Sequence, residues 1–270
     1  MAVILSFPMF KNIFFFLFVI TFFFSCSEFE RKTEKELAQE KFGDIPLVEY
    51  KPSPNPDKNA YFGDLHVHTE NSFDAYTFGT TSSPADAYEF AKGKAIKHPT
   101  GYAIQLSRPL DFYAVTDHGV FMGIVKEAAD TSSEISKYEV AEPFHNLNEN
   151  VSGSILSILR RANSFRPFAQ ALASGIEDGT IDINLLQEVS NGVWQRTIEA
   201  ADQAYVPGEF TTFAAYEYTS SVELYDNYLH RNVIFRDTKN LPKRLFTRGD
   251  SLNPEDLWDW MDGLLSLIHI

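Results

Sequence analysis

The chain has a single cysteine, Cys26, in 270 residues, so no internal disulfide can form. Basic residues are also few, because 23 Lys and Arg stand against 37 Asp and Glu and the formal net charge is −14. Nucleic-acid backbones select surfaces rich in Lys and Arg, so this balance argues against nucleic acid as a partner. Internal repeats and a glycine-rich phosphate loop are absent as well. We attribute the acidity mainly to solubility, with some carboxylates available for divalent cations.

One apolar run lies near the N-terminus, and it is too short for a comfortable membrane span. Lys11 is the one charged residue before Cys26, and residues 13–24 are almost wholly apolar, as in an export signal. The segment resembles a bacterial lipoprotein signal with cleavage before Cys26 and lipidation of its thiol, although Phe23 and Phe24 replace the usual Leu and small residue. A plain secretory signal and an uncleaved anchor are the alternatives. We expect an exported lipoprotein, held by its lipid in the periplasm or at the outer membrane or cell surface.

The organisation expected from the sequence is a signal peptide over residues 1–25, a tether over 26–58 and a folded part from 59 to 270. The tether is charged and then proline-rich, which is typical of a flexible linker. We expect strands at residues 61–67, 111–116, 210–217 and 230–235. We expect helices at residues 83–97, 155–172 and 183–204 and from about 253, the middle two within a helical insertion over about 120–208. These two helices could cover a barrel or form a lid.

Two short motifs end the first two expected strands: Asp64-Leu65-His66-Val67-His68-Thr69 and Thr116-Asp117-His118-Gly119. Side chains at i and i+2 of a strand point to the same face. His66 and His68 therefore project together, as two imidazoles must to hold one metal ion. The second motif adds a carboxylate and an imidazole just past the next strand. Strand ends are where α/β barrels place their chemistry, so we expect a metal site there.

Three further residues are candidate ligands: Asp74 in the loop after the first strand, Glu217 near the end of the third, and His230 at the start of the fourth. Imidazole with carboxylate is the ligand set of Zn, Mn or Fe in hydrolytic sites, and so many ligands indicate more than one ion. Asp117 is expected to act in catalysis by orienting the histidine beside it. Arg231 could grip a phosphate or carboxylate, with a surface salt bridge as the alternative.

These motifs resemble those of the polymerase and histidinol phosphatase (PHP) superfamily. Residues 64–69 are similar to its first motif, 115–119 to its second, 215–217 to the strand with its bridging glutamate, and 230–234 to its third. A closer likeness, to the long secreted PHP-like branch catalogued as a domain of unknown function, is carried by residues 61–66, 209–220 and 230–235. The resemblance implies a distorted (βα)7 TIM-like barrel of the α/β class, with a helical insertion.

The resemblance also implies two or three divalent ions. His66, His68 and Glu217 would bind the first ion, Glu217 and His230 the second, and Asp74 and His118 the third. A water bridging two ions would be the nucleophile. The family's later His and its Asp-x-His pair find no match, and four strands are too few for a closed barrel, so we expect a sequence truncated at the C-terminus.

The leading prediction is a lipid-anchored, metal-dependent hydrolase of a small-molecule phosphate ester. An amidohydrolase-type enzyme acting on C–N or lactone bonds is the first alternative, because those barrels also open with His-x-His. They usually add a carboxylated lysine, and no Lys lies on an expected strand. A non-catalytic metal-binding or ligand-binding surface lipoprotein is the second alternative.

Overall fold

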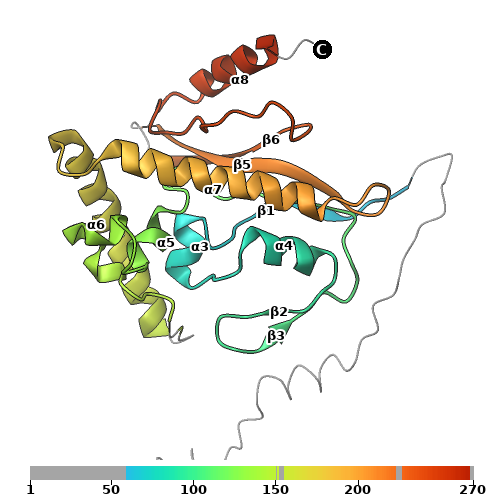
Figure 1. Cartoon of the computed structure of the whole chain (residues 1–270), viewed down its shortest axis with the longest axis horizontal. Helices are drawn as coiled ribbons and strands as arrows, with labels where there is room; N and C mark the ends of the chain where they lie inside the picture. The colour runs from blue at the N-terminus through green and yellow to red at the C-terminus, as the bar shows by residue number, and fades with distance from the viewer. Residues whose placement is uncertain (1–58, 150, 152–154, 223–226, 268–270) are drawn as a thin grey trace, which may run out of the picture. The chain divides into compact units, whose positions relative to one another are not determined.

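A computed structural model describes residues 59–149, 151, 155–222 and 227–267 (Figure 1). The expected signal peptide, Cys26 and tether lie outside these residues. The strands are β1 Gly63–Val67, β2 Ile96–Lys97, β3 Ala103–Ile104, β4 Phe112–Val115, β5 Thr211–Val222 and β6 Asn227–Ile234. The helices are α3 Phe73–Phe78, α4 Pro84–Ala91, α5 Ile124–Ala129, α6 Ile155–Asp178, α7 Ile183–Ala204 and α8 Glu255–Leu267, with short 3-10 turns at Ile135–Lys137 and Glu139–Phe144.

The principal sheet has four strands in the order β1-β4-β5-β6. β1, β4 and β5 are parallel, whereas β6 pairs antiparallel with β5 over eight residue pairs. The sheet is strongly curled, because the side chain of Asn232 on one edge strand reaches the carbonyl of Leu65 on the other, 2.8 Å away. The molecule is therefore a mixed α/β protein with a curled half-barrel.

The prediction of a (βα)7 TIM-like barrel is wrong for the described part of the chain. A closed parallel barrel needs a crossover helix between successive strands, but only four residues separate β5 from β6. That connection suffices for a hairpin and not for a crossover, so the fourth strand turns back instead of extending a parallel barrel.

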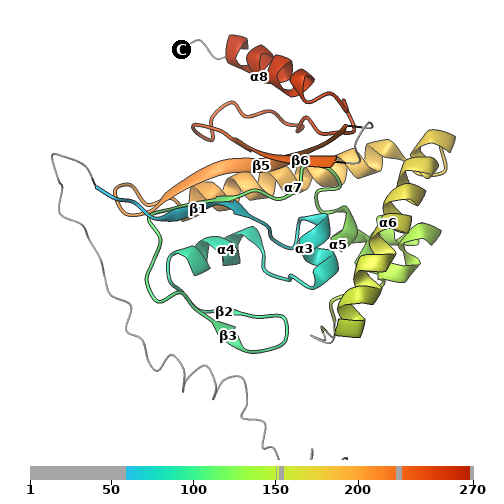
Figure 2. The same ribbon diagram turned by 180° about the vertical axis from the view of Figure 1, so that it is seen from behind.

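Helices α4 and α7 pack against one face of the sheet (Figures 1 and 2). Trp194 of α7 is fully buried with Tyr216 and Tyr218 of β5, and Ala201 packs near Tyr113 of β4. Since side chains alternate along a strand, Glu217 and Thr219 of β5 project to the opposite, concave face. The expected helix at 183–204 is confirmed, and it covers the sheet rather than forming a lid.

Helix α4 begins as the sequence predicts and ends earlier. Ser83 and Asp86 form a capping box around Pro84 at the first helical position. The expected end near Lys97 is wrong, because Gly93 takes a φ of 82° and stops the helix after Ala91. β2 and β3 then form a small separate hairpin.

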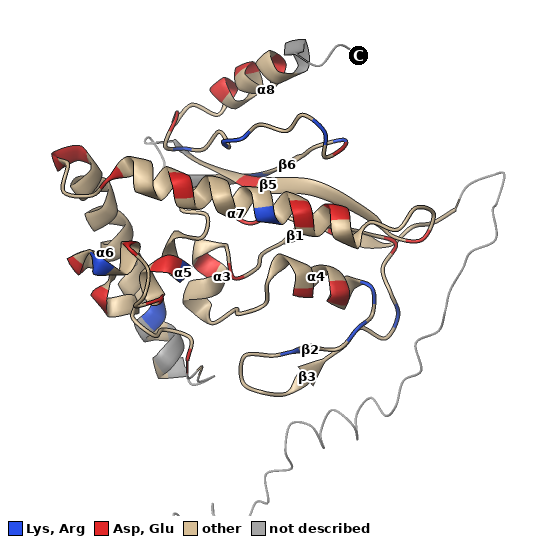
Figure 3. Ribbon diagram, viewed as in Figure 1, with Lys and Arg blue, Asp and Glu red and all other residues tan. Residues whose placement is uncertain are grey.

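Acidic residues are spread over α4, α7 and α8 rather than gathered at one place (Figure 3). This distribution agrees with the interpretation of the negative charge as a solvated surface. Among the described residues, no helix has both the length and the apolar composition that a membrane crossing requires.

Candidate metal centre

Strand β1 contains a β-bulge that sets the direction of its two histidines. Asp64 lies opposite Tyr113 and Val67 opposite Val115, so Leu65 and His66 together face a single residue of β4. The backbone N–H of His66 donates to Oδ1 of Asp64 at 3.0 Å. His66 and His68 both reach the concave face, but the His66 side chain is 55% exposed and that of His68 only 17%.

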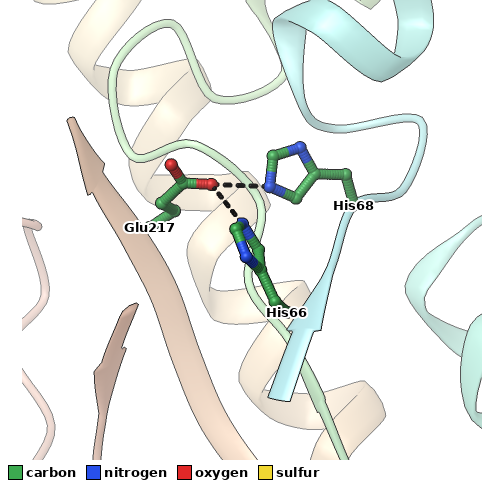
Figure 4. A group of neighbouring side chains, drawn as sticks. All are labelled: His66, His68 and Glu217. Carbon is green, nitrogen blue, oxygen red and sulfur yellow. Dashed lines mark hydrogen bonds and ion pairs between the residues drawn. The ribbon is translucent and has the colours of Figure 1, made fainter. Parts of the chain in front are cut away.

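Glu217 is the carboxylate on which the histidines converge (Figure 4). Its side chain is 1% exposed, and Oε2 lies 2.9 Å from Nε2 of His66 and 2.7 Å from Nε2 of His68. Oε1 contacts Nδ1 of His230 and lies 3.7 Å from Nδ1 of His118. A β-bridge between His118 and Glu217 extends the β4–β5 pairing and brings these two residues together. Both oxygens of one buried carboxylate therefore face imidazoles.

Asp74, in the first turn of α3, lies on the other side of His68. Its Oδ1 is 3.1 Å from Nδ1 of His68 and accepts hydrogen bonds from Ser72 Oγ and the Ala75 N–H. Its Oδ2 is 3.5 Å from Nε2 of His118. Burial alone would raise the pKa of Asp74, but hydrogen bonds with His118, His68 and Ser72 hold it well below its usual range.

His118 is buried and fixed on three sides. The Phe73 ring stacks on it at a centroid distance of 4.4 Å, and Phe165 of α6 stacks on Phe73 at 4.5 Å. Its Nδ1 lies 2.7 Å from the buried hydroxyl of Thr219. When Nδ1 of His118 donates to this hydroxyl, Nε2 is the ring nitrogen that faces Asp74. An ion held between Nε2 and the Asp74 carboxylate would take the place of the hydrogen bond that joins them in the metal-free protein.

The six predicted ligands all lie in this cluster, in three overlapping groups: His66, His68 and Glu217; His68, Asp74 and His118; His118, Glu217 and His230. Within each group the ligand atoms lie within 4.8 Å of one another. A neutral imidazole gives one lone pair to one ion, whereas a carboxylate can bridge two. Glu217 belongs to the first and the third group, and as a carboxylate it can serve an ion in each. The cluster could hold a metal ion.

The metal-free cluster is held together by charge. Burial would lower the pKa of His68, but its hydrogen bonds and charge interactions with Asp74 and Glu217 prevail and raise it to about 10. Burial would raise the pKa of Glu217, but His68, His118 and His66 prevail and lower it to about 2. At neutral pH the metal-free site therefore contains an imidazolium between two carboxylates.

Asp117 and Arg231 were predicted to act in catalysis, and the structure places neither among these groups. Asp117 is fully buried and accepts hydrogen bonds from the N–H and hydroxyl of Thr69, at 2.5 and 2.6 Å, so it holds the turn after His68. Burial raises the pKa of Asp117 to about 6, against the effect of these hydrogen bonds. Arg231 lies opposite Tyr218, donates to Ser220 Oγ at 3.3 Å and faces away from the cluster.

Thr219, Phe73 and Asn232 contact the cluster or its strand and were not predicted. Thr219 follows Glu217 by two residues on the same strand and so shares its face, and this spacing could have identified it. The ring of Phe73 reaches His118 from α3, which the sequence did not reveal as a helix. Asn232 crosses the curled sheet, and no local pattern reports such a contact.

We expect Thr219→Val to weaken binding of the ion held with His118 by about 10- to 100-fold, the usual effect of losing a partner behind a metal ligand. Valine preserves the shape of threonine but cannot accept the Nδ1–H, so the imidazole loses its preferred tautomer. Thr219→Ser keeps the hydroxyl and should stay within about threefold of the wild type. Co2+ titration measures both variants, and equal affinities for the two would contradict this role of the hydroxyl.

Fold and cluster together define an α/β protein with a candidate metal centre on the concave face of a curled sheet. The chain belongs to the family described as "Protein of unknown function (DUF3604)", whose model matches residues 55–267. No curated protein and no solved structure matches the chain. The family description assigns no activity, and the likeness to the PHP superfamily stays a prediction from the motifs.

Proposed function

We propose that this protein is a metal-dependent hydrolase, and that its substrate is a small-molecule phosphate ester. The observation that carries the proposal is Glu217, a buried carboxylate with both oxygens directed at histidines from different strands. Such a carboxylate is suited to bridging two ions. Imidazole and carboxylate ligands favour Zn, Mn or Fe, and the three groups give room for two or three ions.

Bound ions of this kind would lower the pKa of water to near neutrality and stabilise the attacking and leaving oxygens of a displacement. The chain's own residues have supporting parts. Asp74 accepts the Nδ1–H of His68, which leaves Nε2 free for an ion, and Thr219 can accept the Nδ1–H of His118 in the same way. Asp117 anchors Thr69, which follows the second histidine of β1.

A second candidate is hydrolysis of an amide or lactone. The side-chain hydrogen bonds and ion pairs described above join the six ligands to one another and to Ser72, Ala75 and Thr219, and Arg231 lies on the opposite face. A phosphate ester would then be neutralised by the ions and histidines alone, whereas an uncharged substrate needs no such cation. The phosphoester remains the leading proposal because the motifs resemble PHP phosphoesterases.

Metal content and turnover test the proposal together. Elemental mass spectrometry of the purified protein should find about two or more equivalents of Zn, Mn or Fe, and a His66→Ala/His68→Ala variant should lose most of them. The half-buried, distant His98 provides the matched control, His98→Ala, which should retain them. Phosphomonoesters and phosphodiesters, amides and lactones are then assayed with each protein. A protein that binds metal but turns over none of these substrates would contradict the hydrolase proposal and favour a metal-binding protein.

A further inference from the structure

At the β-bulge of β1, two backbone groups form hydrogen bonds with side chains. The His66 N–H donates to Asp64 Oδ1, and the Leu65 carbonyl accepts from Nδ2 of Asn232 at 2.8 Å. The first contact is local. The second joins residues 167 positions apart in the sequence and connects the two edge strands of the sheet.

Asn232 also lies beside the metal centre. It pairs in register with Glu217 across β5 and β6, so the two side chains share the concave face. The Leu65 carbonyl is part of the peptide bond between Leu65 and His66. Nε2 of His66 lies 2.9 Å from Oε2 of Glu217. The amide of Asn232 thus connects β6, next to Glu217, with the peptide bond that precedes His66 on β1.

We propose that Asn232 is a positioning residue of the metal centre, which holds the bulge of β1 and so keeps His66 directed at Glu217. The proposal deepens the proposed function, on whose metal site it rests. His66 needs such support more than its neighbour does. His68 is held through Nδ1 by Asp74 and Ser72, whereas the ring of His66 has a polar contact with Glu217 and a tilted ring contact with His68.

The orientation of the amide supports this role. The Leu65 carbonyl requires a donor, so Nδ2 must face it, and this leaves Oδ1 buried with no hydrogen-bond partner among the described residues. A buried acceptor without a partner lowers stability. Asn232 therefore contributes little net stability to the fold. The hydrogen bond from its Nδ2 to the Leu65 carbonyl is the contact that accounts for an asparagine at this position. Asn232→Ala should consequently leave the melting temperature of the metal-free protein within a few degrees of the wild type.

A double-mutant cycle tests the inference in the full chain with Zn2+ as the probe. Zn2+ affinity is measured by competition with a chromophoric chelator for the wild type, Asn232→Ala, His66→Ala and the double variant. Asn232→Ala should lower the affinity for the tightest ion about 10-fold. In the His66→Ala background the same change should cost less than about twofold, because a residue that acts through His66 has nothing left to position.

An equal loss in both backgrounds would show that Asn232 does not act through His66, and no loss in either would show that the bulge holds without it. Both results overturn the inference while leaving the metal centre intact. The readout is binding alone, so a protein that shows the expected cycle but hydrolyses nothing would refute the hydrolase proposal and keep this one. A wild type that binds no Zn2+ would overturn both.

Discussion

Glu217→Gln is expected to lower the affinity for metal by about 10³-fold, or roughly 4 kcal/mol, the largest effect of any single substitution in the cluster. Glu217 belongs to two of the three ligand groups and is the one carboxylate in each. Glutamine has nearly the same shape, so the backbone and the packing around the site are retained. It removes the negative charge, and it presents an N–H2 donor where an ion needs an oxygen lone pair.

The effect should be larger than that of any histidine variant because the Glu217 carboxylate can serve two ions, whereas a neutral imidazole gives one lone pair to one ion. A histidine confined to one group, such as His230, should cost one ion and leave the first group in place. In metal analysis, Glu217→Gln should therefore lose the ions of both groups that contain Glu217, whereas His230→Ala should lose about one equivalent.

The matched control is Glu199→Gln, which makes the same chemical change on an exposed position of α7. It should bind metal as the wild type does. Thermal melts of the metal-free proteins establish that both variants fold. Retention of full metal content by Glu217→Gln would contradict a bridging carboxylate and would leave the histidines as the main ligands.

The strand-end motifs indicated which side chains come together, for a physical reason. β1 and β4 are parallel neighbours joined through helical segments, so their carboxyl ends meet, and the histidines that follow them meet as well. Glu217 was recognisable because a lone carboxylate on an apolar strand requires a partner. The site could therefore be predicted from local strand patterns without a correct fold.

The barrel prediction failed at the hairpin. The third strand was expected to end at Glu217 and the fourth to begin at His230, which left room for a crossover. In the structure β5 continues to Val222 and β6 begins at Asn227. Thr219, Ser220 and Ser221 weaken the apolar pattern at the end of β5, so the true length of this strand was hidden.

The alternation of side chains along a strand explains the position of Arg231. His230 and Arg231 are adjacent on one strand, so their side chains point to opposite faces, and only one of them can serve a site on the concave face. Arg231 instead lies with its guanidinium 6.0 Å from the centre of the Trp258 ring on the other face.

Metal affinity is expected to rise at least about tenfold for each pH unit between pH 6 and 8, because binding must expel a proton from His68. Interactions with Asp74 and Glu217 overcome the effect of burial and raise the pKa of His68 to about 10, so this imidazole is protonated throughout that range. The pKa values of both carboxylates lie far below it, so they stay ionised and add nothing to the slope. Calorimetry in two buffers of different ionisation enthalpy counts the released proton.

Stability should respond to pH in opposite directions with and without metal. His68 has a folded-state pKa above its unfolded value of 6.5, so its contribution is complete below pH 6.5 and is lost as the pH rises toward 10. The contribution of His68 to the metal-free protein should therefore fall with rising pH, while saturating metal makes the bound form more stable as protons leave the ligands. Denaturant titrations of both forms at pH 6, 7 and 8 measure the two slopes. Parallel slopes, with no proton released on binding, would mean that the metal ligands do not include His68.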